Sequence, residues 1–162
     1  MESIFLCPTD FSRFLSSNSS LFLKVHNSIQ TSPEMLAELE WMEDWNRGSI
    51  YLTEDKKHIQ VNKAGSYLVY VQATFKLPCG NNTRDLRLQL NFHYPERTDQ
   101  LAGAFDSRQL LLEEQQDAQL SFSVLVQMEV GNRLSVLARH RDLIDYDLKP
   151  VSTFLTIIRC SE

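Results

Sequence analysis

The chain has 162 residues, enough for one domain with a full hydrophobic core, and its composition is that of an ordinary globular protein. Its net charge is −5 and its basic residues are scattered, which argues against binding to nucleic acid or to an anionic membrane. No apolar run approaches the roughly 18 residues that a membrane helix needs, and the opening MESIFLC does not read as a signal peptide. If the protein works outside the cell, its export or membrane segment is expected to lie outside this chain.

Residues 1–20, with the Ser-rich stretch LSSNSS, are expected to form a flexible lead-in, and residues 21–162 a single folded domain. From residue 21 onward, segments of alternating apolar residues are separated by turn-forming stretches such as NRG, NKAG and PCGNN. The alternation predicts strands near 21–25, 39–42, 49–53, 58–61, 66–76, 85–94, 109–113, 118–130, 133–140 and 152–159. Many short strands with such separators favour an all-β, antiparallel sandwich or barrel.

The stretch SPEMLAELEWMEDW carries a competing helical signal. Ser32 suits a helix N-cap, Pro33 suits the first helical position, and Leu36 and Leu39 have helical spacing. Because tertiary context often overrides local preference in an all-β chain, we expect at most a helical turn at 33–37, followed by the strand at 39–42.

The stretch GSYLVYVQATF at 65–75 is predicted to be a strand with two apolar faces. The face that suits the core consists of Tyr67, Val69, Val71, Ala73 and Phe75. The opposite face consists of Ser66, Leu68, Tyr70, Gln72 and Thr74. A leucine and a tyrosine are unusual on a sheet face exposed to water, which raises the question of what covers them.

Catalytic and metal-binding patterns are absent from the sequence. The four histidines, His26, His58, His93 and His140, are isolated and show no HxH spacing, so neither a metal role nor a cofactor is expected. There is no GxSxG elbow and no Gly-rich phosphate loop, and carboxylate pairs such as Glu113-Glu114 suit solvated loops. We therefore expect no enzyme activity.

The cysteines and the glycosylation sequons are weak indicators of an extracellular setting. Cys7, Cys79 and Cys160 are an odd number without CxxC spacing, which is compatible with one disulfide and one further thiol. Sequons occur at Asn18 and Asn81, and Asn81 lies in a polar, turn-rich loop that could accommodate a glycan.

Three blocks in order along the chain carry a family resemblance. They are LEWMEDWNRGSIYL with KHIQVNKAGSYLVYVQATF, VQMEVGNRLSVLARHRDLIDYD, and STFLTIIR. Over residues 39–160 they resemble the tumour necrosis factor ligand homology domain, with its "GxYxVYxQVxF" strand, its "xxLxxGDxLxV" strand-turn-strand and its closing "TFFGxxxL" strand. The short strands and loops look more like the divergent lymphocyte costimulatory ligands than like tumour necrosis factor itself.

The resemblance implies a jelly-roll β-sandwich that assembles as a homotrimer and binds cysteine-rich receptors of the tumour necrosis factor receptor family between neighbouring protomers. It implies an extracellular cytokine or costimulatory ligand, either the ectodomain of a type II membrane protein or a secreted protein. The expected trimer-facing residues are Leu68, Tyr70, Gln72, Ser121, Leu125, Gln127 and Phe154. The expected core neighbours on the same strands are Phe122, Val124, Val126, Met128, Leu155 and Ile157. Ser121 departs from the family, since many members carry an aromatic there, so the axial packing is expected to be thinner.

The family's receptor contacts suggest a second set of residues in loops, where aromatic and arginine anchors are favoured at interfaces. The expected receptor-binding residues are Tyr94, Arg84, Arg141, Asp142, Leu143, Asp145 and Tyr146. The alternative is that Tyr94 is a partly covered residue at a strand end and that the acidic loop is merely solvated.

The cysteines also depart from the family pattern. Many relatives link two loops by a disulfide, but only the first of those loops carries a cysteine here, Cys79, and the second, within 95–117, has none. Cys7–Cys160 is the more plausible pair, because Cys160 ends the last strand close to where the chain must begin, and Cys79 is then free or links molecules.

Two other functions remain open at this point. A C1q-like trimeric recognition module would share the jelly roll, but no Gly-X-Y repeat is present. A monomeric carbohydrate-binding jelly roll would need an exposed aromatic platform, for which Trp41 and Trp45 are the candidates, and Trp41 is expected to pack in the core.

Overall fold

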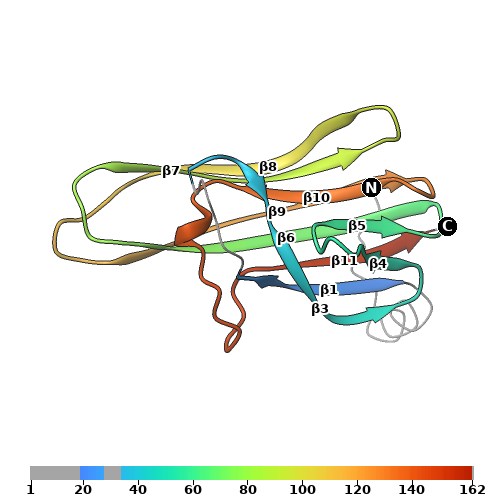
Figure 1. The fold of residues 1–162 in the computed structure, drawn as a ribbon, viewed down its shortest axis with the longest axis horizontal. Coiled ribbons are helices and arrows are strands. Elements are labelled where there is room, and N and C mark those ends of the chain that lie inside the picture. Colours follow the sequence, from blue (N-terminus) through green and yellow to red (C-terminus); the bar gives the residue numbers. More distant parts are fainter. Residues whose placement is uncertain (1–18, 28–33, 162) are drawn as a thin grey trace.

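The computed structural model of the chain describes residues 19–27 and 34–161. In this part the chain forms β-strands and one short 3-10 helix, η1, and no α-helix (Figure 1). The strands are β1 (Ser20–His26), β2 (Ala37–Glu38), β3 (Glu40–Arg47), β4 (Ile50–Leu52), β5 (His58–Val61), β6 (Gly65–Leu77), β7 (Thr83–His93), β8 (Thr98–Gln109), β9 (Gln116–Met128), β10 (Arg133–Ala138) and β11 (Phe154–Ser161), and η1 spans Arg141–Leu143. No helix among these residues is both long and apolar enough to cross a membrane.

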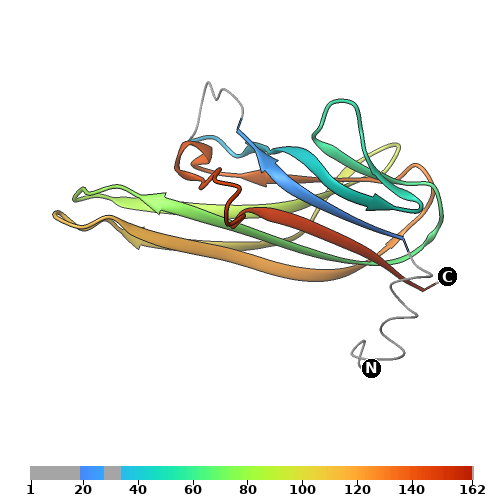
Figure 2. The same cartoon turned by 90° about the horizontal axis from the view of Figure 1, so that it is seen from below.

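The strands build two antiparallel sheets that sandwich the core. The five-stranded sheet has the order β3-β1-β11-β6-β9, and the other has the order β4-β5-β10-β7-β8 with β2 paired to β10. The chain crosses between the sheets after β1, β2, β3, β5, β6, β8, β9 and β10, which gives the jelly-roll connectivity predicted from the sequence. The long strands β6 to β9 extend to one end of the molecule, and the end of β11 lies toward the other (Figures 1 and 2).

The core consists of the inward faces of both sheets, as the alternation predicts. On β6 the five residues predicted for the core are fully buried. On β9, Val126 and Met128 are buried, while Phe122 and Val124 are partly buried and pack against the core. Leu155 on β11 is fully buried, as is its neighbour Ile157. Each such side chain contributes about 1.5–3 kcal/mol relative to exposure, so the two layers are stabilised mainly by this apolar contact.

The helical turn predicted at 33–37 is wrong for the residues that the structure describes there. Residues 34–36 form a turn and a bend, and β2 begins at Ala37. The Leu39 amide donates to the Val136 carbonyl (2.8 Å), and the Trp41 amide donates to that of Lys56 (2.8 Å). Leu39 and Trp41 are both buried, so period-2 burial against the core outweighs the local helical preference.

The strand predicted at 109–113 is also wrong, and a strand was missed at 98–109. β8 is an edge strand whose TDQLAGAFDSRQ sequence lacks large apolar alternation, so it gives little strand signal. Residues 110–115 instead form the β8–β9 loop, with Leu110 buried and Leu112 exposed. Two backbone hydrogen bonds join this loop to the β6–β7 loop, from the Gly80 amide to Leu111 and from the Leu110 amide to Asn82.

The proposed boundary between residues 1–20 and 21–162 stays a prediction, because residues 1–18 lie outside the described part. β1 begins at Ser20, one residue from the expected start of the folded domain.

Candidate functional site

One face of the five-stranded sheet points away from the core and carries apolar side chains. We call it the aromatic face; it consists of Phe22, Trp45, Leu68, Tyr70, Leu125, Phe154 and Ile158. Strand pairing sets these residues side by side. Tyr70 on β6 lies opposite Thr156, which in turn lies opposite Phe22, and Phe22 lies opposite Trp45 at the sheet edge. Leu68 lies between Ile158 and Leu125.

The rings on this face pack on one another. The ring centroids of Phe22 and Phe154 are 5.4 Å apart with the planes nearly parallel, and those of Tyr70 and Phe154 are 5.8 Å apart. The Tyr70 hydroxyl donates to Gln72 Oε1 (2.9 Å), and Gln72 Nε2 donates to the Ser152 carbonyl (3.1 Å). The polar atoms around Tyr70 are thus hydrogen-bonded within the chain, which leaves its ring and those of its neighbours as the contact surface.

Several of these apolar side chains remain in contact with water in the isolated chain. Leu125 is 54% exposed and Trp45 is 46% exposed. Contiguous apolar surface of this kind on a folded domain indicates a protein interface.

The structure brings together all seven residues predicted from the sequence for the trimer face. Gln127 accepts a hydrogen bond from the Ser66 hydroxyl (2.9 Å), and Ser121 is exposed opposite Gln72. Phe154 on β11 pairs with Gln72 from the opposite side. Ser121, Gln72 and Phe154 therefore lie side by side across β9, β6 and β11, and the aromatic ring in this group is that of Phe154. Their role in a trimer stays a prediction.

Three further members of the aromatic face were missed from the sequence: Phe22, Trp45 and Ile158. The signal for Phe22 was present, since it alternates with Leu21 and Leu23 in LFLKV, both of which are fully buried. The signal for Trp45 was not, because a bulge between Phe22 and Leu23 shifts the register of β1 against β3.

The predicted receptor-binding residues fall into two groups. Arg84 is the second residue of β7, and both Arg84 and Asp142 lie near enough to His140 to shift the pKa of that histidine. Burial lowers the pKa of His140 most strongly, Asp142 opposes this effect and Arg84 adds to it. Tyr94 follows the other end of β7, ten residues from Arg84, or about 33 Å along an extended strand.

Most of the predicted loop residues hold the loop in place. The Tyr146 hydroxyl donates to the Arg141 carbonyl (2.7 Å), and burial raises the pKa of Tyr146 to about 12. Arg141 is buried, Leu143 packs against the core, and Asp145 accepts from the Ser152 hydroxyl (3.1 Å). Asp142 is exposed, so it is the loop residue best placed for a partner.

Tyr94 is partly buried at the β7–β8 turn. Its ring lies 4.4 Å from that of Phe92, and the Arg97 guanidinium lies 4.0 Å above it. The packing matches the alternative of a strand-end residue, yet the side chain is not fully covered.

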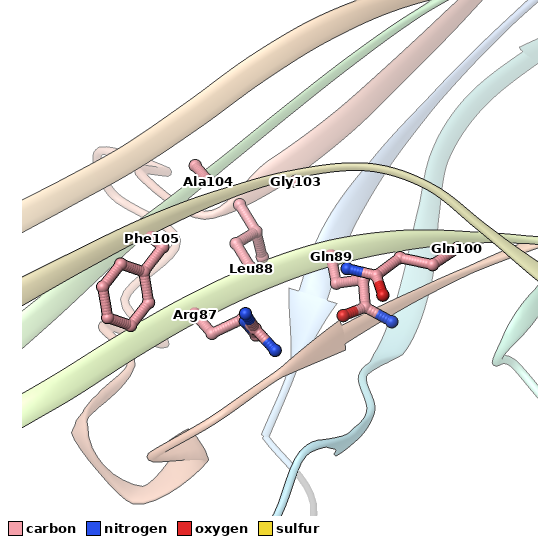
Figure 3. A pocket seen from close by; sticks show the side chains of 7 residues that line it. All are labelled: Arg87, Leu88, Gln89, Gln100, Gly103, Ala104 and Phe105. Carbon is pink, nitrogen blue, oxygen red and sulfur yellow. The ribbon is translucent and has the colours of Figure 1, made fainter.

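A further exposed aromatic, Phe105, lies on β8, the strand that the sequence did not predict. It is 60% exposed, and the Arg87 guanidinium lies 5.8 Å from its ring centroid. Both line a hollow of about 190 Å³ between β7 and β8 (Figure 3). The hollow is smaller than usual small-molecule sites, of about 300–1,000 Å³, so it suits a protein contact better.

The structure describes two of the three cysteines, Cys79 and Cys160, and one of the two sequon asparagines, Asn81. Cys79 and Cys160 form no disulfide with each other, and burial raises the pKa of the Cys160 thiol. The expected partner Cys7 lies outside the described residues, as does Asn18, so the Cys7–Cys160 disulfide stays a prediction. Asn81 is exposed in the β6–β7 loop, where a glycan remains an expectation.

The histidines are not all isolated, contrary to the sequence-based expectation. His58 and His93 lie with ring centroids 4.9 Å apart, and His58 Nε2 is 3.1 Å from a Glu38 carboxylate oxygen. Burial lowers the pKa of His93, and His58 lowers it further.

Trp41 is 1% exposed, so it cannot form part of a carbohydrate-binding platform with Trp45.

Comparisons with known proteins agree with this architecture. A sequence model of the TNF (Tumour Necrosis Factor) family matches residues 39–160. Solved structures of murine APRIL, a ligand of the same superfamily, cover 88% of this chain and 99% of their own. The structure at pH 8.0 has a TM-score of 0.68 at 16% identity, and that at pH 5.0 a TM-score of 0.64 at 17% identity. No curated protein matches the sequence.

Proposed function

Because the chain belongs to the tumour necrosis factor family, we propose that it is a cytokine ligand that assembles as a homotrimer and clusters cysteine-rich receptors of the tumour necrosis factor receptor family. Ligands of this family are cytokines and not enzymes, and they act outside the cell or at its surface. We infer the same location here, as the ectodomain of a type II membrane protein or as a secreted form.

The observation that carries the trimer is the aromatic face. Burying a leucine or an aromatic side chain contributes about 1.5–3 kcal/mol, and a threefold assembly repeats every such contact three times. Leu125 and Trp45 are the largest apolar contributions still available, since about half of each side chain is exposed. Phe154 and Tyr70 offset the missing aromatic at Ser121 in this proposal, because their tilted rings, 5.8 Å apart, occupy that side of the face.

Tyr70→Asp tests this assembly. The substitution places an unpaired carboxylate in the proposed contact, where its desolvation is costly, so we expect monomers that keep the β-sheet circular dichroism signal. Tyr51→Asp is the matched control, because Tyr51 is a partly buried tyrosine on β4 of the other sheet, and we expect it to remain trimeric. Sedimentation velocity distinguishes the two, and a trimeric Tyr70→Asp variant would show that the face assignment is wrong.

Receptor recognition is proposed at the loops that carry Arg84 and Asp142 and at Tyr94. Arginine and tyrosine are the residue types that dominate interface energetics, and Asp142 adds an exposed charge that can select the partner. The direct test is a binding screen of the purified protein against cells that each display one cysteine-rich receptor of the family. Saturable binding to at least one receptor supports the proposal, and binding to none of the complete panel contradicts it.

A further inference from the structure

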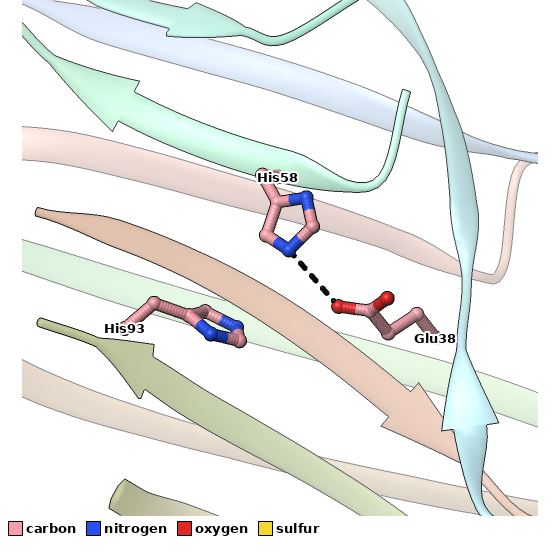
Figure 4. Close-up of side chains that lie close together, drawn as sticks. All are labelled: Glu38, His58 and His93. Atoms are coloured by element: carbon pink, nitrogen blue, oxygen red, sulfur yellow. Dashed lines mark ion pairs between the residues drawn. The ribbon is translucent and has the colours of Figure 1, made fainter. Parts of the chain in front are cut away.

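Three strands that are far apart in the sequence bring a carboxylate and two imidazoles together on the outward face of the six-stranded sheet (Figure 4). Glu38 comes from β2, His58 from β5 and His93 from β7, and each strand pairs with β10. Their partners on β10 are Leu137, Ser135 and Arg133, respectively. The pairing fixes the three backbones relative to one another, and the three ligand atoms lie within 4.8 Å of each other.

We propose that Glu38, His58 and His93 form a zinc-binding site that ties β2 to the body of the sheet. The distance of 3.1 Å between His58 Nε2 and Glu38 Oε2 fits two ligands of one ion. Zinc bonds of about 2.0–2.1 Å in tetrahedral geometry separate the ligand atoms by about 3.3 Å. Because the three ligand atoms lie within 4.8 Å of one another, no separation in the cluster has to close by more than about 1.5 Å, a change on the scale of small side-chain rotations.

Both imidazoles have the outer partners that metal ligands usually have. His58 Nδ1 lies 2.7 Å from Asp55 Oδ2, which fixes the ring and turns Nε2 toward Glu38. His93 Nδ1 lies 3.0 Å from the Thr98 hydroxyl. Such carboxylate or hydroxyl partners hold the ring orientation and increase the basicity of the ligating nitrogen. Hydrogen bonds from Thr53, the Lys57 amide and His58 in turn hold Asp55 in place.

The donor set favours a borderline-soft ion such as zinc over calcium and magnesium. Two imidazoles and one carboxylate suit a borderline-soft ion, whereas calcium and magnesium prefer oxygen ligands alone. The His58 side chain is 13% exposed and that of Glu38 is 31% exposed, so the site is sheltered but reachable from water, which can supply a fourth ligand. His93 Nε2 lies 2.7 Å from the buried Ser135 hydroxyl, and coordination requires this hydroxyl to give up that partner.

Zinc is expected to stabilise the fold because β2 is a strand of only two residues. Its two residues pair only with the end of β10, through Ala37–Ala138 and Glu38–Leu137. Zinc held by Glu38 adds a bond from this segment to β5 and β7 that the backbone pairing does not supply. Binding to the folded state alone is therefore expected to raise the melting temperature.

A metal-free arrangement accounts for some of the same contacts, since a doubly protonated His58 can bridge Glu38 and Asp55. The two arrangements differ at His93, which is a ligand in the zinc site and is not needed in the bridge. His93→Gln separates them, because it abolishes zinc binding only if His93 coordinates the ion.

The experiment uses the intact protein after treatment with a chelator, titrated with zinc sulfate by calorimetry and analysed for metal after dialysis. We expect one zinc per chain and a melting temperature about 5–10 °C higher at zinc concentrations about 100-fold above the dissociation constant. Glu38→Gln, His58→Gln and His93→Gln are each expected to weaken binding by about 100-fold or more. Asp55→Asn, at an exposed outer partner, should weaken it by about 10–100-fold. His26→Gln changes an exposed histidine at the end of β1 and should have no effect.

Three results would overturn the proposal. One is no zinc bound by the wild type at about 100 µM free metal, a concentration far above that needed for structural zinc sites. Another is unchanged binding in His93→Gln with a native circular dichroism spectrum. The third is loss of binding in a Cys79→Ser, Cys160→Ser double variant, which would assign the metal to thiols instead.

Discussion

Two tryptophans four residues apart on β3 have different roles. Trp41 is 1% exposed and packs in the core, whereas Trp45 is 46% exposed at the edge of the aromatic face. We expect Trp41→Ala to lower the free energy of unfolding by about 3–5 kcal/mol, because it leaves a large cavity. Trp45→Ala should cost about 1 kcal/mol or less in the dissociated chain but weaken self-association. Urea denaturation at low protein concentration measures both, and equal losses would contradict the assignment of Trp45 to the surface.

Receptor contact can be separated from structural packing at Tyr94. Tyr94→Phe keeps the ring against Phe92 and Arg97 and removes only the hydroxyl. If the receptor contacts the Tyr94 hydroxyl, we expect the variant to bind the receptor about tenfold more weakly with an unchanged melting temperature. Arg84→Ala and Asp142→Ala, at two positions that each influence the pKa of His140, should each weaken binding by a similar factor. Surface plasmon resonance with the receptor found in the screen gives the values, and full affinity in all three variants would place the receptor elsewhere.

At the scale of the strands, Gly103 on β8 lies against the backbone of β7. A Cβ atom at this position would lie 2.8 Å from the Leu88 carbonyl oxygen, which is part of the backbone and cannot swing away. We expect Gly103→Ala to destabilise the protein by about 1–3 kcal/mol, as overpacking does. Ser107→Ala, at an exposed position on the same strand, should cost less than about 1 kcal/mol. Thermal unfolding distinguishes the two, and equal stability of both variants would mean that β8 is free to move away.

The strands that the sequence predicts well are those with strong apolar alternation. β5 and β6 agree closely with the predicted ranges, because each has one face fully in the core. β8 could not be predicted, since an edge strand with small and polar residues needs little apolar alternation, and with it Phe105 was missed. The helical turn predicted for the segment at 34–37 was wrong because the local sequence favours a helix, whereas pairing with β10 favours a strand and outweighs this preference.

The sequence predicted only some residues of the aromatic face, those on strands with strong apolar alternation. Alternation alone separates Leu68 and Tyr70 from the core residues of β6, and the family resemblance supplies a reason for apolar side chains that point away from the core. The meeting of His58 and His93 could not be read from the sequence, because it depends on two strands 35 residues apart both pairing with β10. Contacts set by long-range register are those that a single sequence leaves open.

At the scale of the whole molecule, the two sheets differ in the side chains on the faces that point away from the core. Apart from Phe105 and Leu101 on β8, the six-stranded sheet presents mainly polar and charged residues along with the Glu38–His58–His93 cluster, whereas the five-stranded sheet presents packed aromatic rings and leucines. The membership of the chain in the tumour necrosis factor family and its likeness to the fold of murine APRIL fit a ligand whose apolar face is buried by copies of itself. The central claim is therefore that this face is an interface and not a solvent-exposed surface.

Sedimentation equilibrium of the wild-type protein at micromolar concentration tests this claim most directly, with Leu125→Asp beside it. Leu125 is 54% exposed, so an aspartate there costs the single chain little while placing charge at the proposed contact. We predict a species of three times the chain mass of 18.8 kDa for the wild type, and a monomer of native β-sheet content for the variant. A wild-type monomer at these concentrations, or a variant that remains trimeric, would contradict the account.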